Sequence, residues 1–474
     1  MQRSDMKIVV CGGGVAGLMT ALALDGALGT QYEIILIDDG HANEADVVYG
    51  SVTSPIAYDF LRGLGLDEPV LFSQSSTSFS FGTQYYDWPG VSADWVQCHH
   101  QILPVLDGVP LQHHLTRNQR QIAPLLISGF AARQGKFAHP PEDNSNPLSR
   151  AEYGYQFAAN EWTRLLATKL TRTRVTHLSE PVAKVSAHQG EIEGVLLTSG
   201  EAVTGDVYID CTGLKRQLMS AIGASFNTSR TIGLKQAVQP IDQLGPACRQ
   251  VRANANGWSA QVFLQNAIRT LTVERGGDAT NSILCELGHL DAGWVGNTIA
   301  VGAAASVHDP LTPGPMVMLQ RDIERLLDLV PISHDVSMER REFNRRRIDD
   351  AAHTDMFADA FYVSNTAAAP FWRDAKASAQ SEGLTRKIVQ FESRGVLAKY
   401  DLEPFNDEDW TILHHGMGRR AARYDLQADA SPKLKIDQQL DGMSRAIEQL
   451  VARMPPHHLY VANMKRYFEK QQYA

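Results

Sequence analysis

The first forty residues contain three apolar runs, and a glycine-rich turn separates the first run from the second. Residues 7–10 predict a strand, and the apolar stretch 18–24 after the turn is typical of a buried helix. A second strand-like run at 32–37 ends on Asp38. Strand, turn, helix and strand in this order predict a βαβ unit with Rossmann-like topology.

Alternating hydrophobic and polar residues predict further strands in the middle of the chain. The alternation covers 78–86 and parts of 182–210 and 230–290, and the last stretch predicts a second sheet. Residues 155–170 have helical periodicity instead. A buried strand at 298–301 is the last strand that the pattern predicts.

From about residue 316 onward the pattern is mainly helical. We therefore predict an α/β fold with a Rossmann-like sheet domain, a second, antiparallel sheet and a mainly helical C-terminal part. The expected division is residues 1–330 for the two sheets and 331–474 for the helical region.

Composition and charge exclude several classes of protein. The net charge of −9 leaves no basic surplus for nucleic acid. No run of about 20 apolar residues could cross a membrane, and the polar start does not resemble a signal peptide. The five cysteines are scattered without a CxxC pair. We expect a cytoplasmic protein with reduced thiols and no membrane or nucleic-acid partner.

The glycine-rich turn has the spacing of a dinucleotide-binding motif. Its glycines allow a tight turn, a close approach of the backbone to a pyrophosphate and close packing of helix on sheet, while the helix N-terminus directs N–H groups at the phosphates. Asp38 follows at the distance expected for an acid that binds ribose hydroxyls. The expected contacts of the turn are Gly12, Gly14, Val15, Ala16 and Gly17.

Two more strands end on small residues. Residues 207–210 lead to Gly213, and residues 298–301 lead to Gly302. Each alone fits an ordinary strand-to-helix turn, but three such turns fit one long cofactor, FAD, better than NAD.

At this point the chain resembles the flavin-dependent tryptophan halogenases, which share a fold with flavin monooxygenases of the aromatic hydroxylase type. Residues 209–213 match the family's I-D-C-T-G as they stand. The other similar segments are 49–55, 107–114, 155–159, 297–302, 309–311, 341–344 and 370–373.

The resemblance implies a cofactor, a reaction partner and a set of site residues. Reduced FAD would react with O₂, and a separate reductase would supply the reduced flavin. The aromatic substrate would be a small molecule or part of a protein, and a homodimer is left open. Further flavin contacts implied by the family's motifs are Gly50, Ser51, Gly213, Gly302, Asp309, Pro313 and Gly314.

The chain departs from the family where the chemistry takes place. Ser80 stands at the position of the catalytic lysine, and a hydroxyl cannot replace an ammonium group. Thr312 stands at the position of the catalytic glutamate. Pro313 and Gly314 replace the halide-binding pair, and Ser51 replaces a glutamate before them in the chain.

These departures lead us to predict hydroxylation of an indole or phenol group through a flavin C4a-hydroperoxide. His113 falls on the family's pocket histidine and could accept a proton, so the catalytic candidates are His113, Ser80 and Thr312. No metal site is expected, since the pair His99–His100 has no further ligands at metal spacing. Two alternatives stay open: a halogenase with a displaced lysine, and an inactive FAD-binding partner protein.

Overall fold

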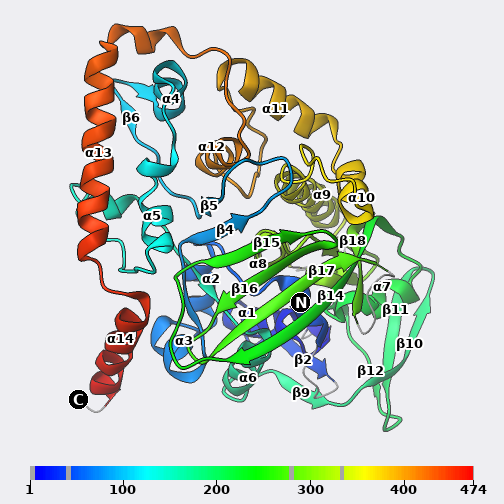
Figure 1. The fold of residues 1–474 in the computed structure, drawn as a ribbon. Coiled ribbons are helices and arrows are strands. Elements are labelled where there is room, and N and C mark those ends of the chain that lie inside the picture. The colour runs from blue at the N-terminus through cyan, green and yellow to red at the C-terminus, as the bar shows by residue number, and fades with distance from the viewer. Residues whose placement is uncertain (1–5, 39–43, 277–281, 331–335, 473–474) are drawn as a thin grey trace.

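The computed structural model describes residues 6–38, 44–276, 282–330 and 336–472. Two large sheets form its centre, and helices from the last third of the chain cover one side (Figure 1). The expected boundary between the sheet region and the helical region, at residue 330, lies next to residues 331–335, which are outside the described residues. No helix in the described ranges is long and apolar enough to cross a membrane.

The first sheet is the predicted Rossmann-like one, with the strand order β19-β20-β13-β1-β2-β9. All its neighbours are parallel except β19 and β20. The apolar runs form buried strands because helices cover both faces of a parallel sheet. Its strands are β1 (Met6–Cys11), β2 (Tyr32–Asp38), β9 (Thr176–Ser179), β13 (Val207–Asp210), β19 (Trp294–Val295) and β20 (Thr298–Ala300).

The second sheet has eight strands in the order β21-β18-β14-β17-β16-β15-β4-β5. It is the expected antiparallel sheet, except that β4 joins β15 in parallel. Its strands are β4 (Gly82–Tyr86), β5 (Trp95–Cys98), β14 (Phe226–Pro240), β15 (Arg249–Asn254), β16 (Gly257–Phe263), β17 (Ala267–Arg275), β18 (Ile283–Leu290) and β21 (Ser306–Val307).

The remaining strands of the described residues belong to smaller sheets. The strands predicted in 182–210 include a three-stranded sheet of β10 (Val182–His188), β11 (Glu191–Leu197) and β12 (Ala202–Val203). Two-stranded pairs are β3 (Ser78–Ser80) with β8 (Gly154–Gln156), and β6 (Val105–Leu106) with β7 (Val109–Pro110).

The helices predicted at 18–24 and 155–170 and the mainly helical C-terminal part are confirmed, and the sheet half has further helices that were not predicted. The sheet half contains α1 (Val15–Ala27), α2 (Ala57–Gly63), α3 (Glu68–Gln74), α4 (Leu111–Asn118), α5 (Ile127–Arg133), α6 (Ala159–Leu170) and α7 (Gln217–Ala221). The C-terminal part contains α8 (Gly314–Asp328), α9 (Ser337–Asp359), α10 (Pro370–Ser378), α11 (Glu382–Arg394), α12 (Asp407–Gly416), α13 (Lys433–Arg453) and α14 (His457–Gln472).

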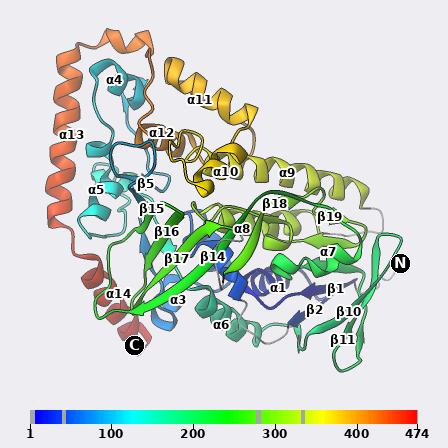
Figure 2. The ribbon, with the colours of Figure 1, turned by 45° about the vertical axis from the view of Figure 1, so that its right-hand side comes forward.

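The helices of the C-terminal part do not stand apart from the sheets. In both views α9 and α10 lie above the eight-stranded sheet, and α12 lies above β5 (Figure 2). Helix α13 runs along α4 and α5 at the edge of the molecule. One main hydrophobic core joins residues of both sheets with residues of α8, α9, α10 and α12.

Candidate functional site

The three glycine turns meet at the carboxyl edge of the first sheet. Cys211 N–H donates to the carbonyl of Cys11 at 2.8 Å, which joins the turns after β1 and β13. A Cβ on Gly12, whose φ is +124°, would lie 2.2 Å from the carbonyl oxygen of Cys211. Gly17 faces the carbonyl of Gly12, where a Cβ would be only 1.7 Å away. These close approaches are those that a dinucleotide motif needs, so the edge fits the expected FAD.

Asp38 ends β2 at the same edge, as the sequence predicts. Its carboxylate lies 2.6 Å from Nε2 of His177 on the neighbouring β9. A ribose hydroxyl would therefore meet a carboxylate that His177 already holds in place.

A second carboxylate lies where the phosphates are expected. Val15, the first residue of α1, donates its N–H to Oδ2 of the buried Asp46 at 2.9 Å. Gly14, the N-cap, supplies no side chain for this purpose. Sequence reasoning missed Asp46, because no local motif connects it with a helix that starts 31 residues earlier.

The segment around Gly50 contacts the Asp309–Gly314 turn. A Cβ on Gly50, with φ +72°, would lie 3.2 Å from the carbonyl oxygen of Pro310. Ser51, at the family's glutamate position, also has a positive φ of 59°. The hydroxyl of Tyr49 accepts the N–H of Ala303 at 3.2 Å, beside Gly302. These contacts bring three expected flavin-binding segments together.

Buried arginines fix the Asp309–Gly314 turn. Arg249 donates to the carbonyls of Pro310 at 2.6 Å and Leu311 at 3.0 Å. Asp309 pairs with Arg230 at 2.5 Å and accepts the hydroxyl of Tyr362 at 2.9 Å. Burial lowers the pKa of Arg249 to about 10, which leaves it charged at neutral pH. The turn that carries Thr312 is therefore held rigidly from the sheet side.

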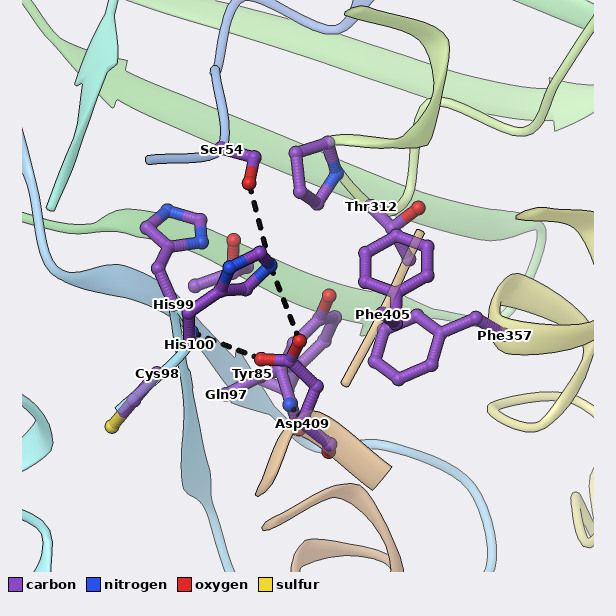
Figure 3. A pocket seen from close by; sticks show the side chains of 12 residues that line it. Ser54, Tyr85, Gln97, Cys98, His99, His100, Thr312, Phe357, Phe405 and Asp409 are labelled. Atoms are coloured by element: carbon purple, nitrogen blue, oxygen red, sulfur yellow. Dashed lines mark hydrogen bonds and ion pairs between the residues drawn. The ribbon is translucent and has the colours of Figure 1, made fainter. Parts of the chain in front are cut away.

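A small cavity lies between this turn, β4, β5 and α12 (Figure 3). Thr312 and Pro313 form one wall, and Phe357 with Phe405 forms another, their rings stacked 3.9 Å apart. Its volume of about 20 Å³ is room for one water molecule rather than for an aromatic ring. Its lining is Ser54, Thr83, Tyr85, Gln97, Cys98, His99, His100, Thr312, Pro313, Phe357, Phe405 and Asp409.

His100 is the best-positioned proton-transfer group in this cavity. Its Nε2 lies 3.3 Å from Oδ2 of Asp409 and 3.5 Å from Oγ of Ser54. Its backbone N–H donates to Oδ1 of Asp409 at 3.0 Å, and its φ is +41°. Burial raises the pKa of Asp409 above its usual value, and the neighbouring His100 offsets only part of this increase. An imidazole oriented by a carboxylate in this way can accept and return a proton.

Two of the three catalytic candidates lie at or next to this cavity. Thr312 is in its wall, and Ser80 lies behind His99, with Oγ 3.4 Å from Nε2. Burial lowers the pKa of His99 to about 3, so this imidazole is neutral. Among the described residues that line this cavity, none supplies the ammonium group that the family's lysine would bring.

His113 is placed elsewhere. It lies on α4, where its Nδ1 is 3.3 Å from the backbone N of Asp425, and it is absent from the cavity lining. The histidines that sequence reasoning set aside, His99 and His100, line the cavity instead. They directly follow β5, and their adjacency was the signal that the sequence offered.

The lining that the structure describes contains neither lysine nor glutamate. A buried lysine, Lys387, lies behind the cavity wall, with Nζ 2.7 Å from Oε1 of Glu403 and 4.7 Å from the centre of the Trp410 ring. It does not reach the cavity. The described residues contain no cluster of three or more His, Cys, Asp or Glu side chains that could hold a metal ion.

Comparisons with known proteins agree with this picture. The family model for tryptophan halogenase matches residues 7–433. The chain is 24% identical over 444 residues to a 7-chloro-L-tryptophan 6-halogenase of Kutzneria sp. (strain 744), covering 82% of this chain and 85% of that one. Its fold is similar to BrvH, a flavin-dependent halogenase from Brevundimonas sp. BAL3, with a TM-score of 0.88, 21% identity and coverage of 98% and 99%. A flavin-dependent halogenase from Xanthomonas campestris superimposes with a TM-score of 0.87 at 23% identity and coverage of 97% and 98%.

Proposed function

Because the chain belongs to the tryptophan halogenase family, a family of FAD-dependent oxidoreductases, we propose that it oxidises an electron-rich aromatic group, with halogenation as the first candidate reaction. The relatives of known activity are halogenases, which favours this reaction over the hydroxylation predicted from the sequence. A separate reductase would deliver the reduced FAD.

One observation carries the proposal: the segments that follow Gly50 and Asp309 converge with β4 and β5 on a single small cavity. The bound flavin supplies the oxidising chemistry with O₂. The chain supplies the rest: Arg249 fixes the turn at Thr312, and the packed Phe357 and Phe405 keep bulk water out. His100, oriented by Asp409, is placed to accept the proton that the aromatic ring loses on substitution, once the cavity, which holds about one water molecule as it stands, opens to admit the ring.

Hydroxylation is the second candidate, and the residues of the cavity favour it. The family's lysine and glutamate positions hold Ser80 and Thr312, and the described lining contains no amine. Without a cation to hold an oxidised halide, direct transfer of oxygen would be the simpler reaction.

Product analysis separates the two reactions. The protein is incubated with reduced FAD, a flavin reductase, ¹⁸O₂ and a panel of indoles and phenols, with and without bromide. A bromine isotope pattern in the product supports halogenation, whereas a mass gain of one labelled oxygen supports hydroxylation. Binding of FAD without product or substrate-dependent O₂ uptake would contradict both and favour an inactive FAD-binding protein.

Variants test the role of His100. His100→Gln is expected to lower turnover at least tenfold while FAD binding is retained, because the proton acceptor is lost. His188→Gln, on the exposed strand β10, is the matched control. His113→Gln examines the sequence-based candidate directly. Normal turnover in His100→Gln together with loss in His113→Gln would reverse the assignment.

A further inference from the structure

His308 and Asp355 join the Asp309–Gly314 turn to helix α9, outside the small cavity. Nδ1 of His308 lies 2.7 Å from Oδ1 of Asp355, and Nε2 lies 2.8 Å from Oγ of Ser306. Both ring nitrogens are therefore engaged, and only 2% of the His308 side chain is exposed. Because His308 comes directly before Asp309, its ring fixes the start of the turn against α9.

The other end of the same turn forms a wall of the small cavity. Thr312 and Pro313 line the cavity together with Phe357 of α9 (Figure 3). Asp355 and Phe357 are two residues apart in α9, so they project about 200° apart around the helix axis. Helix α9 thus crosses the turn with the His308–Asp355 pair at one edge and the cavity at the other.

Two further contacts hold α9 on the turn between these edges. Tyr362, which follows α9, donates its hydroxyl to Asp309 at 2.9 Å, and both side chains are buried. A Cβ on Gly314 would lie 2.7 Å from Cγ2 of the buried Thr354, so the helix and the turn pack closely there. In contrast, 37% of the Asp355 side chain is exposed. Water that enters at this edge can bind the freed groups, so this contact costs less to break than the buried ones.

The other walls of the small cavity are fixed more firmly. Arg249 binds two carbonyls of the turn from the sheet side, and β4 and β5 are paired strands of the eight-stranded sheet. The capping box with Asn406 holds Asp409 at the start of α12. Of the described lining, this leaves the wall of Phe357 and Phe405 as the part that can move, and α9 carries Phe357.

We propose that the His308–Asp355 pair is a clamp that sets the width of the small cavity and so decides which aromatic rings can enter. With the clamp closed the cavity has a volume of about 20 Å³, and a ring binds only to molecules whose clamp is open. The apparent affinity for the ring is reduced by the fraction of open molecules. Both residues act by positioning α9, since neither lines the cavity. The inference rests on the proposed function, because it takes this cavity as the place where the aromatic group reacts.

Calorimetric titration of the full-length chain with indole, in the presence of oxidised FAD, tests the clamp without turnover. Asp355→Ala is expected to bind indole roughly fivefold more tightly than the wild-type protein, because no clamp has to be broken. Asp355→Asn keeps an acceptor for the N–H of a neutral His308 and should bind like the wild-type protein. Asp349→Ala is the matched control, since Asp349 lies on the same helix in an exposed pair with Arg345.

A double-mutant cycle shows whether the two residues act as one clamp. His308→Ala is expected to give a similar gain in affinity for indole. The double variant His308→Ala/Asp355→Ala should gain no more than either single variant, because the second change removes a contact that is already lost. Hydrogen–deuterium exchange gives a readout that does not depend on affinity: amides in 350–362 should exchange faster in Asp355→Ala than in Asp355→Asn.

The outcomes separate the clamp from the proposed reaction. Affinity for indole no higher than that of the wild-type protein in both alanine variants, or gains that add in the double variant, would overturn the clamp. If the alanine variants bind indole more tightly but no product forms with reduced FAD, the proposed reaction fails and the clamp stands. Where product forms, the alanine variants should lower KM for indole more than they change kcat.

Discussion

Asp46 places a carboxylate at the start of α1, where the phosphates of a dinucleotide are expected. The N–H of Val15 donates to this carboxylate, so one donor of the phosphate site is already occupied. A pyrophosphate that approaches the turn must share this place with a buried negative charge. We therefore expect Asp46 to oppose flavin binding and the glycine turn to favour it.

Asp46→Asn is expected to tighten FAD binding about tenfold, or roughly 1.4 kcal/mol, because it removes the charge and keeps an acceptor for Val15. Quenching of flavin fluorescence measures the affinity. Asp206→Asn is the control: Asp206 accepts the N–H of Lys7 at the other end of β1, so the variant changes the net charge equally. Unchanged or weaker FAD binding in Asp46→Asn alone would refute this role.

Residue roles could be predicted where the evidence was local. The glycines after β1 and the acid ending β2 follow from a short motif, and the structure has them at one sheet edge. Asp46 and His100 could not be placed in this way, because their partners Val15 and Asp409 are distant in sequence. Only the fold shows that His100, and not His113, lines the small cavity.

Helix α12 borders the small cavity, and its first turn positions Asp409. The Asn406 side chain accepts the N–H of Asp409 at 2.9 Å, and the Asp409 carboxylate accepts the N–H of Asn406 at 3.0 Å. This reciprocal capping box fixes the carboxylate that holds His100.

Asn406→Ala is expected to lower the free energy of unfolding by about 1 kcal/mol, the usual cost of a lost N-cap, and to reduce turnover as well, because Asp409 and His100 lose their alignment. Denaturant unfolding and product formation measure the two effects. Ser381→Ala removes the N-cap of α11, whose hydroxyl accepts from Leu384, and should cost similar stability without affecting turnover. Equal turnover in both variants would argue against alignment through the cap.

Periodicity predicted the elements well but could not predict their pairing. The alternation of 78–86 indicates strand, and β3 and β4 lie there. That β4 pairs in parallel with β15, more than 160 residues away, depends on long-range packing that no local pattern encodes. The helical C-terminal part was expected from its period, but its packing over β5, which closes the small cavity, was not.

At the scale of the whole molecule, stability depends on buried groups whose protonation is set by the fold. Asp359 at the end of α9 is one example: burial and the neighbouring Asp355 raise its pKa to about 8. The folded state then holds a proton that the unfolded state releases above its usual pKa, so stability declines as pH rises toward 8.

Asp359→Asn is expected to raise the free energy of unfolding at pH 8 by more than about 1.4 kcal/mol, the value of one pKa unit. At pH 4, where the unfolded carboxyl is itself largely protonated, the variant and the wild-type protein should differ little. Urea unfolding at both pH values measures this difference. Asp374→Asn, at a half-exposed ion pair with Arg275, is the control and should not show the gain at pH 8.

Buried histidines lower the stability of the protein at acidic pH. Burial lowers the pKa of His99 and His415 to about 3 and of His457 to about 4. Below the usual histidine pKa of about 6.5, these histidines bind a proton in the unfolded state but not in the folded state. Each histidine therefore costs about 1.4 kcal/mol per pH unit as the pH falls toward its folded pKa.

His457→Gln is expected to make the decline of stability between pH 6 and pH 4.5 less steep by about 1.4 kcal/mol per pH unit. The variant lacks one group that binds a proton in the unfolded state only. The free energy of unfolding, measured by urea titration at several pH values, gives the slope for each protein. Loss of the bond from Nδ1 to the Gly245 carbonyl lowers stability at every pH and so leaves the slope unaffected. His188→Gln, on exposed β10, should retain the wild-type slope. Equal slopes in His457→Gln and the wild-type protein would mean that this histidine takes up its proton in the folded state.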